Sequence, residues 1–300
     1  MKDEAYRAWD EKDLVELLAL EALDASHFRS RFGQINENQR TYGGQIMGQA
    51  MIAAGRTAPA GRSPTMMQFL FLQGAKADET IAYDVTALQD GKRFCSRNVR
   101  GAQSGGRIVC DAQVTFSAPL ESPSHMGPPP SGLAEQDPET LPTPSQLPAS
   151  LAAEVESVLG YRVADVSFLD MRVRGPSDIA LTLLPEPRLG FWLKSRRALP
   201  DDPLIQAAAF AYLSDWWINF GSCGGHVPAT LAAGRRIYVA SLNHAIWLHR
   251  PPRADEWMFF DCASPSAASG RGFTNARVYD RAGRLFASVT QECLVAMMDE

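Results

Sequence analysis

The chain contains one stretch of sequence twice. Thr65–Leu72 aligns with Ser241–Leu248, about 176 residues later, and Gly106–Ile108 aligns with Gly283–Leu285 at nearly the same spacing. A spacing that holds over roughly forty residues indicates two similar folding units fused in one chain. After such a fusion, one copy can keep the reactive side chains while the other acts as scaffold, so differences between the copies point toward chemistry.

The length and composition bound the classes of protein to consider. The 300 residues accommodate two units of about 120–150 residues each. The net charge of −5 argues against a nucleic-acid-binding protein, which normally presents a basic face. None of the five cysteines forms a Cys-x-x-Cys pair, which favours reduced thiols and a cytoplasmic location. No apolar run is long enough to span a bilayer, and we recognise no signal peptide.

Both halves show the same order of predicted elements: strand, helix, and then several strands in antiparallel succession. Small residues form a helix that begins near Gly44, and Asp202 caps a second helix that begins at Pro203 and ends near Asp215. A central helix wrapped by an antiparallel sheet is the α+β hotdog arrangement, which the order of elements alone favours only weakly. The expected strands are Phe28–Ile35, Met66–Leu72, Ile81–Leu88, Phe94–Ala102, Ile108–Phe116, Val163–Val173, Phe191–Arg196, Ile237–Ser241, His244–His249, Trp257–Ala263, Gly272–Tyr279 and Leu285–Val295.

A proline-rich segment separates the two halves. Its composition cannot supply a hydrophobic core, so we expect residues 119–150 to form a linker that lies outside both units. The domain prediction is therefore an N-terminal repeat over 1–118 and a C-terminal repeat over 151–300.

Asp215 is the first candidate functional residue. It lies at the end of an apolar helix and is followed by Trp216 and Trp217. The helix dipole disfavours a carboxylate at this end, and the apolar neighbours predict partial burial. Burial raises the pKa of a carboxyl group toward the range in which it serves as a general base. An ordinary surface carboxylate is the alternative.

Gln291 is the second candidate because it lies on the apolar face of a predicted strand. Side chains alternate along a strand, so Gln291 shares its face with Val289 and Cys293. The aligned residue in the first copy is Val114, with Gln113 as its neighbour should the alignment slip by one residue. A buried amide needs hydrogen-bond partners, either at a reactive site or in a purely structural role.

Three polar residues, Ser241, Asn243 and His244, lie together in the second copy. Their aligned counterparts in the first copy are Thr65, Met67 and Gln68. A polar strand edge facing solvent is the alternative for Asn243 and His244. Ser241 lacks the Gly-x-Ser-x-Gly surroundings of a serine hydrolase, so a Ser-His-Asp triad with His244 and Asp215 is poorly supported. No histidine has metal-ligand spacing to Cys or Asp, so we predict no metal site.

Several motifs spread over nearly the whole chain are specific as a set, although each alone is common. They are Tyr42–Ala50, Tyr83–Val85 with Asp90-Gly91, Ala211–Asp215, Ser241–Arg250, Ala267–Gly272 and Gly283–Glu292. As a set they resemble the acyl-CoA thioesterase II family, the TesB-like double-hotdog thioesterases. The resemblance implies two fused hotdog repeats, each with a central helix wrapped by an antiparallel sheet, and assembly into a homo-oligomer.

The resemblance also implies an activity and a set of site residues. In this family an Asp, a Ser or Thr, and a Gln hold and activate a water, and by position these are Asp215, Ser241 and Gln291. The implied reaction is hydrolysis of acyl-CoA to a fatty acid and coenzyme A, without metal or cofactor. Helix N-terminal glycines can approach the thioester oxygen, and arginines can bind phosphates, with a surface salt bridge as their alternative. The expected substrate contacts are Gly43, Gly44, Gln45, His244, Arg250 and Arg271.

Two other functions are compatible with a hotdog fold. A hotdog hydratase or dehydratase also uses acyl-CoA, but it needs a His–acid pair on the catalytic helix, and residues 203–217 contain no histidine. A non-catalytic acyl-CoA-binding hotdog protein would be expected to lack the Asp-Ser-Gln set, which this sequence contains.

Overall fold

The computed structural model describes residues 7–36, 38–160, 162–173 and 187–298. The elements of the first half are β1 (Arg7–Ala8), α1 (Leu14–Leu18), β2 (Leu20–Ala22), β3 (His27–Ser30), β4 (Phe32–Gly33), α2 (Gly43–Thr57), β5 (Ser63–Phe71), β6 (Ala82–Asp90), β7 (Phe94–Gln103), the 3₁₀ turn η1 (Ser104–Gly106) and β8 (Arg107–Ser117). Those that follow are the 3₁₀ turns η2 (Pro138–Thr140) and η3 (Pro144–Gln146), then α3 (Ala149–Leu159), β9 (Leu169–Val173), β10 (Arg188–Ser195), α4 (Pro203–Ser214), α5 (Phe220–Cys223), η5 (Gly224–His226), α6 (Val227–Ala232), β11 (Arg236–Leu248), β12 (Met258–Ala268), β13 (Arg271–Asp280) and β14 (Leu285–Met298).

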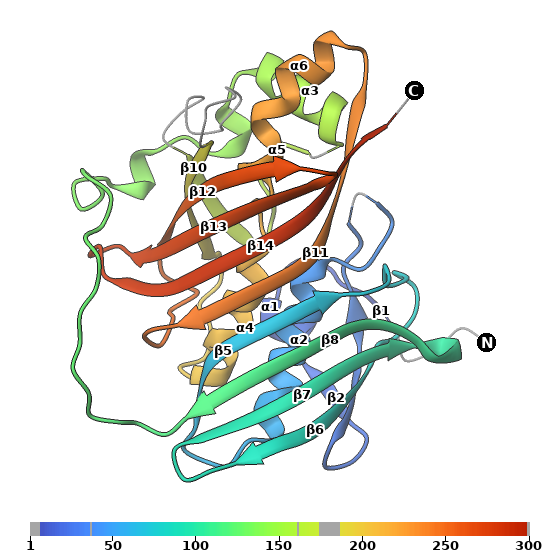
Figure 1. Cartoon of the computed structure of the whole chain (residues 1–300), viewed down its shortest axis with the longest axis vertical. Helices are drawn as coiled ribbons and strands as arrows, with labels where there is room; N and C mark the ends of the chain where they lie inside the picture. The colour runs from blue at the N-terminus through green and yellow to red at the C-terminus, as the bar shows by residue number, and fades with distance from the viewer. Residues whose placement is uncertain (1–6, 37, 161, 174–186, 299–300) are drawn as a thin grey trace.

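Twelve strands form one continuous sheet in the order β2-β3-β6-β7-β8-β5-β11-β14-β13-β12-β10-β9. The first six strands belong to the first half of the chain and the last six to the second half. The two units therefore join edge to edge through the antiparallel pairing of β5 with β11, where Phe69 lies opposite His244. Figure 1 shows this sheet in front of α2 and α4. The predicted double hotdog, with helices that begin at Gly43 and Pro203, is confirmed.

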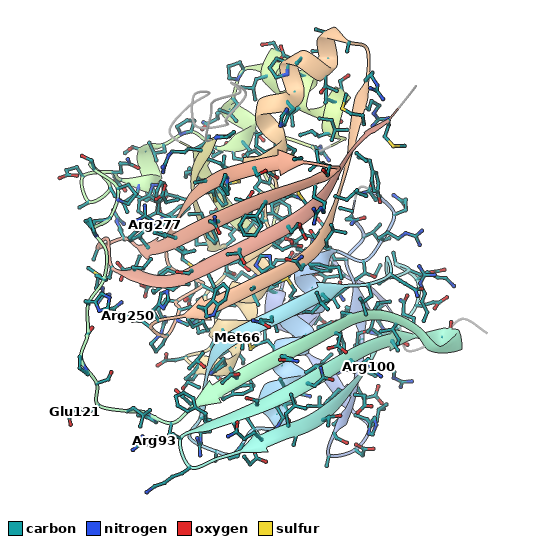
Figure 2. The ribbon with its side chains drawn as sticks, viewed as in Figure 1. Met66, Arg93, Arg100, Glu121, Arg250 and Arg277 are labelled. Carbon is teal, nitrogen blue, oxygen red and sulfur yellow. The ribbon has the colours of Figure 1, made fainter. Side chains whose placement is uncertain are left out.

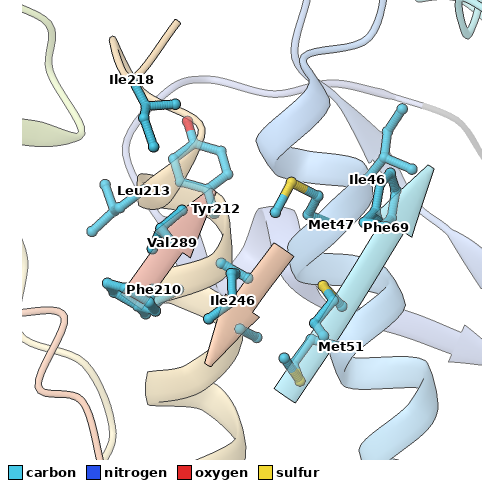
Figure 3. Packing of buried hydrophobic residues seen from close by; sticks show 14 of the residues in the cluster. Ile46, Met47, Met51, Phe69, Phe210, Tyr212, Leu213, Ile218, Ile246 and Val289 are labelled. Carbon is cyan, nitrogen blue, oxygen red and sulfur yellow. The ribbon is translucent and has the colours of Figure 1, made fainter. Parts of the chain in front are cut away.

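The two central helices pack against each other beneath the junction of the units. Small residues in α2 allow close approach: a Cβ on Gly48 would lie 2.9 Å from the carbonyl oxygen of Ala208 in α4. Figure 3 shows apolar side chains between the helices and the central strands, among them Met47 from α2, Phe210 from α4 and Ile246 from β11. No helix among the described residues is long and apolar enough to cross a membrane.

A β-bulge corrects the alignment of the two copies by one residue. The predicted strands 237–241 and 244–249 are one strand, β11, whose register against β14 shifts between Ser241 and Asn243. The equivalent shift in the first unit lies between Pro64 and Met66, where β5 pairs with β8. Matching the two bulges makes Pro64, and not Thr65, the counterpart of Ser241.

The same match determines the counterparts of the two other polar residues in the inner face. Met67 lies opposite Val114, as His244 lies opposite Gln291, and all four side chains are buried. Met67 is therefore the counterpart of His244, where the sequence alignment gave Gln68, while Val114 is the counterpart of Gln291 as predicted. Because β5 and β11 carry a bulge at the same place, the copies match without a gap at a spacing of 177 residues (64 to 241), one more than the spacing of 176 taken from the sequence motif (65 to 241).

The proline-rich segment does not lie wholly outside the cores. Figure 1 shows the chain after β8 running past the ends of the strands to the second unit. Leu133 and Leu147 are then buried, and the indole nitrogen of Trp192 donates to Oε1 of Gln136 at 3.1 Å. The prediction that the segment avoids both cores is wrong for this second part, because leucines between the prolines cover apolar surface of the second unit.

Candidate active site

Asp215 lies where the two units meet. It caps the C-terminus of α4 and is 7% exposed. Its carboxylate faces the N-terminus of α2, where the backbone N–H of Gly44 donates a hydrogen bond to it. A Cβ on Gly43 would lie 2.7 Å from Oδ2 of Asp215, so the glycine makes room for the carboxylate. A residue of the second unit is thus held by the helix of the first.

The structure brings Asp215, Ser241 and Gln291 together, although they come from a helix end and two strands. Nε2 of Gln291 donates to Oδ1 of Asp215 at 2.7 Å and lies 2.7 Å from Oγ of Ser241. The Ser241 hydroxyl donates to the same Oδ1 at 3.3 Å. These three hydrogen bonds close a triangle around one carboxylate oxygen.

The bulge in β11 explains why Ser241 can reach this cluster. In a regular strand, side chains three residues apart point to opposite faces. The extra residue lets both Ser241 and His244 pair with inward-facing residues of β14, which are Cys293 and Gln291. The irregularity therefore directs the hydroxyl of Ser241 toward the helix that carries Asp215.

Burial determines the electrostatics of the cluster. Loss of hydration raises the pKa of Asp215 from 3.8 to about 7, although hydrogen bonds from Gln291, Ser241 and Gly44 favour the ionised form. A carboxyl group with this pKa can accept a proton near neutral pH and return it in a later step. The expectation that the apolar end of α4 perturbs Asp215 is confirmed.

A cavity of about 490 Å³ opens onto Asp215 and Ser241. This volume lies in the range of small-molecule sites in proteins. Its walls come from both units and are largely apolar or aromatic near the cluster, with Phe71 from the first unit and Trp217 from the second. Arg40 and Arg162 also line it and are exposed.

Some residues that line this cavity were not predicted from the sequence to be functional. Arg40 lies two residues before the Tyr42–Ala50 motif and could have been included with it, whereas Arg162 carries no local signal. Trp217 was considered only as a neighbour that buries Asp215. Of the predicted substrate contacts, Gly43 lines the cavity, and Gly44 lies beside it at the carboxylate.

Four predicted substrate contacts lie elsewhere, and their positions do not support direct contact with a molecule in this cavity. Gln45 is fully buried, and its amide bonds to the backbone N–H of Gln34 at 2.8 Å and to the carbonyl of Phe32 at 2.7 Å. Gln45 therefore anchors the segment that precedes α2. His244 is 1% exposed and does not line the cavity.

The two predicted phosphate-binding arginines also lie away from the cavity. Arg250 donates to the carbonyl of Leu285, and Figure 2 places it at the rim of the sheet, beyond the end of β11. Arg271 forms an ion pair with Glu292 at 3.2 Å, which in turn accepts from Asn243. The surface ion pair, given above as the alternative for these arginines, describes Arg271.

Comparison with known proteins gives a consistent result for both halves. A model of the acyl-CoA thioesterase C-terminal domain matches residues 136–295, and a model of the N-terminal domain matches residues 33–117.

The chain belongs to the acyl-CoA thioesterase family.

Individual members of this family are similar to this chain along almost its full length. Acyl-coenzyme A thioesterase 8 of Mus musculus is 28% identical over 95% of this chain and 89% of its own length. Acyl-CoA thioesterase 2 of Haemophilus influenzae is 28% identical over 94% of this chain and 96% of its own. The crystal structure of an acyl-CoA thioesterase II from Mycobacterium marinum is 29% identical, with a TM-score of 0.76 over 96% of this chain and 99% of that one. The thioesterase family inferred from the sequence motifs is confirmed.

Proposed function

We propose that this protein hydrolyses acyl-CoA thioesters to a free fatty acid and coenzyme A, with Asp215, Ser241 and Gln291 acting on one water. The observation that carries the proposal is the hydrogen-bonded triangle of these three residues, of which Asp215 and Ser241 line the cavity. The substrate class is supported by the relatives, which are named as acyl-CoA thioesterases.

Asp215 acts as the general base in this mechanism. Its carboxylate removes a proton from the water as the water oxygen attacks the thioester carbon, forming a tetrahedral intermediate with a negative oxygen. The carbon–sulfur bond then breaks, and Asp215 returns the proton to the departing coenzyme A sulfur. A pKa of about 7 suits both steps, because the group exchanges a proton readily near neutrality.

Ser241 and Gln291 hold the carboxylate that activates the water, and they position the water through it. Each donates to Oδ1 of Asp215, which leaves the other carboxylate oxygen directed toward Gly43 for the water. The N-terminus of α2, whose Gly44 N–H donates to Asp215, carries a partial positive charge that stabilises the negative oxygen of the intermediate. The glycines there let the thioester approach the backbone.

The geometry disfavours the rival mechanisms. A hydratase or dehydratase needs a His–acid pair in the cavity, whereas burial lowers the pKa of His244 to about 3 and its ring lies behind Gln291. A serine nucleophile needs a histidine base, whereas the hydroxyl of Ser241 bonds to Asp215 and Nε2 of His244 bonds to Oγ of Ser214 at 3.0 Å.

A steady-state assay over a series of acyl-CoA chain lengths, with release of free thiol as readout, tests the function. We expect turnover that Asp215→Asn abolishes or strongly reduces. Binding of acyl-CoA without thiol release by the native protein would favour the non-catalytic alternative. An acyl-serine adduct at Ser241, detected by mass spectrometry of the native protein during turnover, would contradict the water mechanism.

We also propose that the protein forms a homo-oligomer in the cytoplasm. The outer face of the sheet exposes Leu70 on β5 and Trp247 on β11, with exposed fractions of 49% and 38%, which suits contact with a second copy; Leu70 lies opposite Asn243 and Trp247 lies opposite Met66. Light scattering tests the assembly, and a monomeric mass would contradict it. The five cysteines are free and buried, which suits a reducing compartment.

A further inference from the structure

Two buried polar atoms next to the catalytic triangle are left without partners. Oε1 of Gln291 and Nδ1 of His244 form no hydrogen bond of good geometry within the described part of the chain, although the two side chains are close enough for Gln291 to oppose the lowering of the His244 pKa. The two residues lie directly opposite each other on β14 and β11, and each is 1% exposed. Buried polar atoms are normally satisfied, so two adjacent unpaired ones point to a shared bond.

The orientation of the Gln291 amide explains what Oε1 needs. The NH₂ group uses both hydrogens, one toward Asp215 and one toward Ser241. Its oxygen must therefore point away from the cavity, where it can only accept a hydrogen bond. An amide without a donor at its oxygen can rotate by a half turn, which would place a carbonyl oxygen against the carboxylate of Asp215.

The imidazole of His244 can supply that donor in one of its two neutral tautomers. A neutral imidazole has one N–H and one lone pair. Nε2 lies 3.0 Å from Oγ of Ser214, whose single hydrogen can go either to Nε2 or to the carbonyl oxygen of Ala211, 2.9 Å away. If the hydroxyl donates to Ala211, the ring donates from Nε2, and both Nδ1 of His244 and Oε1 of Gln291 stay unpaired. If it donates to Nε2, the ring hydrogen is on Nδ1 and these two buried atoms can pair with each other.

We propose that His244 is a positioning residue of the proposed thioesterase reaction, whose Nδ1–H donates to Oε1 of Gln291 while Nε2 accepts from Ser214. This chain of bonds fixes the amide of Gln291 as a donor to Asp215 and Ser241. The role rests on the proposed function, although the tautomer does not.

Two further observations support this role. Burial lowers the pKa of His244 to about 3, so the ring stays neutral over the working range of pH and keeps one donor and one acceptor. In the first unit the counterpart of His244 is Met67, which lies opposite Val114. Where no amide needs orienting, the fold places no histidine.

The tautomer can be measured without any assay of activity. Nitrogen-15 NMR of the full chain labelled at its five histidines distinguishes the two neutral forms, and the His244→Leu spectrum identifies the signal of His244. We expect the Nδ1–H form. An Nε2–H form would overturn the proposal even if the protein hydrolyses acyl-CoA, and a protein inactive on acyl-CoA could still show the expected tautomer.

Kinetics of two substitutions test the positioning role. His244→Asn keeps an N–H near the place of Nδ1, whereas His244→Leu removes it. We expect His244→Leu to lower kcat about 10–100-fold with KM nearly unchanged, the range for loss of one positioning hydrogen bond, and His244→Asn to recover most of kcat. In a Gln291→Ala background, His244→Leu should cause no further loss.

The pH profile separates positioning from mere support of the core. Without an oriented Gln291, the ionised form of Asp215 loses one hydrogen bond, so the acid limb of kcat/KM should move to higher pH in His244→Leu. Met67→Leu, at the matching buried position of the first unit, serves as control and should leave that limb in place. An unmoved limb in His244→Leu, or equal losses of kcat in His244→Leu and His244→Asn, would refute the role.

Discussion

Replacing Asp215 by asparagine tests the centre of the proposed mechanism. The amide oxygen of the variant still accepts the bonds from Gln291 and Ser241, so the cavity keeps its shape while the base is lost. We expect kcat to fall about 10²-fold or more, the range for removal of a positioned general base. Thiol release from a saturating acyl-CoA, followed at constant pH, measures this change.

The pKa of Asp215 sets the pH dependence of the native enzyme. With a pKa of about 7, roughly one tenth of the carboxyl groups are ionised at pH 6 and nine tenths at pH 8, so kcat/KM should rise about tenfold over that interval. The residual activity of Asp215→Asn should lack this limb. The two profiles together identify the titrating group.

The sign of the effect of Asp215→Asn on the free energy of unfolding can also be predicted. The folded state raises the pKa of Asp215 from 3.8 to about 7, so between these values the folded protein holds a proton that the unfolded chain has lost. The free energy of unfolding therefore falls as pH rises from about 4 to about 7, by up to about 4 kcal/mol. Asp215→Asn lacks this loss and should be no less stable than the native protein at pH 8, as measured by denaturant midpoints.

Asp202→Asn is the matched control, since it makes the same change at the other end of α4. Asparagine also caps a helix, so this variant should keep both activity and stability. Native rates in Asp215→Asn would refute the assignment of the base. If kcat/KM of Asp215→Asn still fell at acid pH as it does in the native protein, a group other than Asp215 would be the one that titrates.

Three further outcomes follow from the structure. Ser241→Ala and Gln291→Ala should each lower kcat about 10–10³-fold with the fold intact by circular dichroism, because each removes one hydrogen bond to the base; full activity in either would exclude it from the site. Gly44→Ala should reduce stability and the yield of folded protein, since a Cβ there would overlap the backbone carbonyl of Tyr212; an unchanged melting temperature would contradict that contact. Leu133→Ala should cost about 2–4 kcal/mol of unfolding free energy, because the side chain is buried, and a loss no larger than that of a substitution at the exposed Leu120 would contradict its burial.

Local sequence patterns determined the secondary structure and the family. The capping residue Asp202 with Pro203 marks the start of α4, and alternation of apolar residues marks Gln291 as inward-facing, because both signals act over a few residues. The repeat predicted two units, and shared motifs identified their family.

Other features were decided by contacts between distant residues. The bulges at Ser241 and Pro64 moved the match of the copies by one residue, because strand register depends on the partner strand and not on the strand alone. The burial of Leu133 could not be read from a segment rich in proline, because it depends on the apolar surface that the second unit happens to leave uncovered.

The site itself shows the same division. The sequence identified Asp215, Ser241 and Gln291 as candidate residues, and the family resemblance assigned them to one site. Only the tertiary structure decided that Gly43 and Gly44 of the other unit complete the surroundings of Asp215, that Arg250 and Arg271 lie outside the cavity, and that His244 lies behind Gln291. The physical reason is that α2 and α4 meet beneath the β5–β11 junction, so the environment of Asp215 depends on packing between residues more than 150 positions apart in the chain.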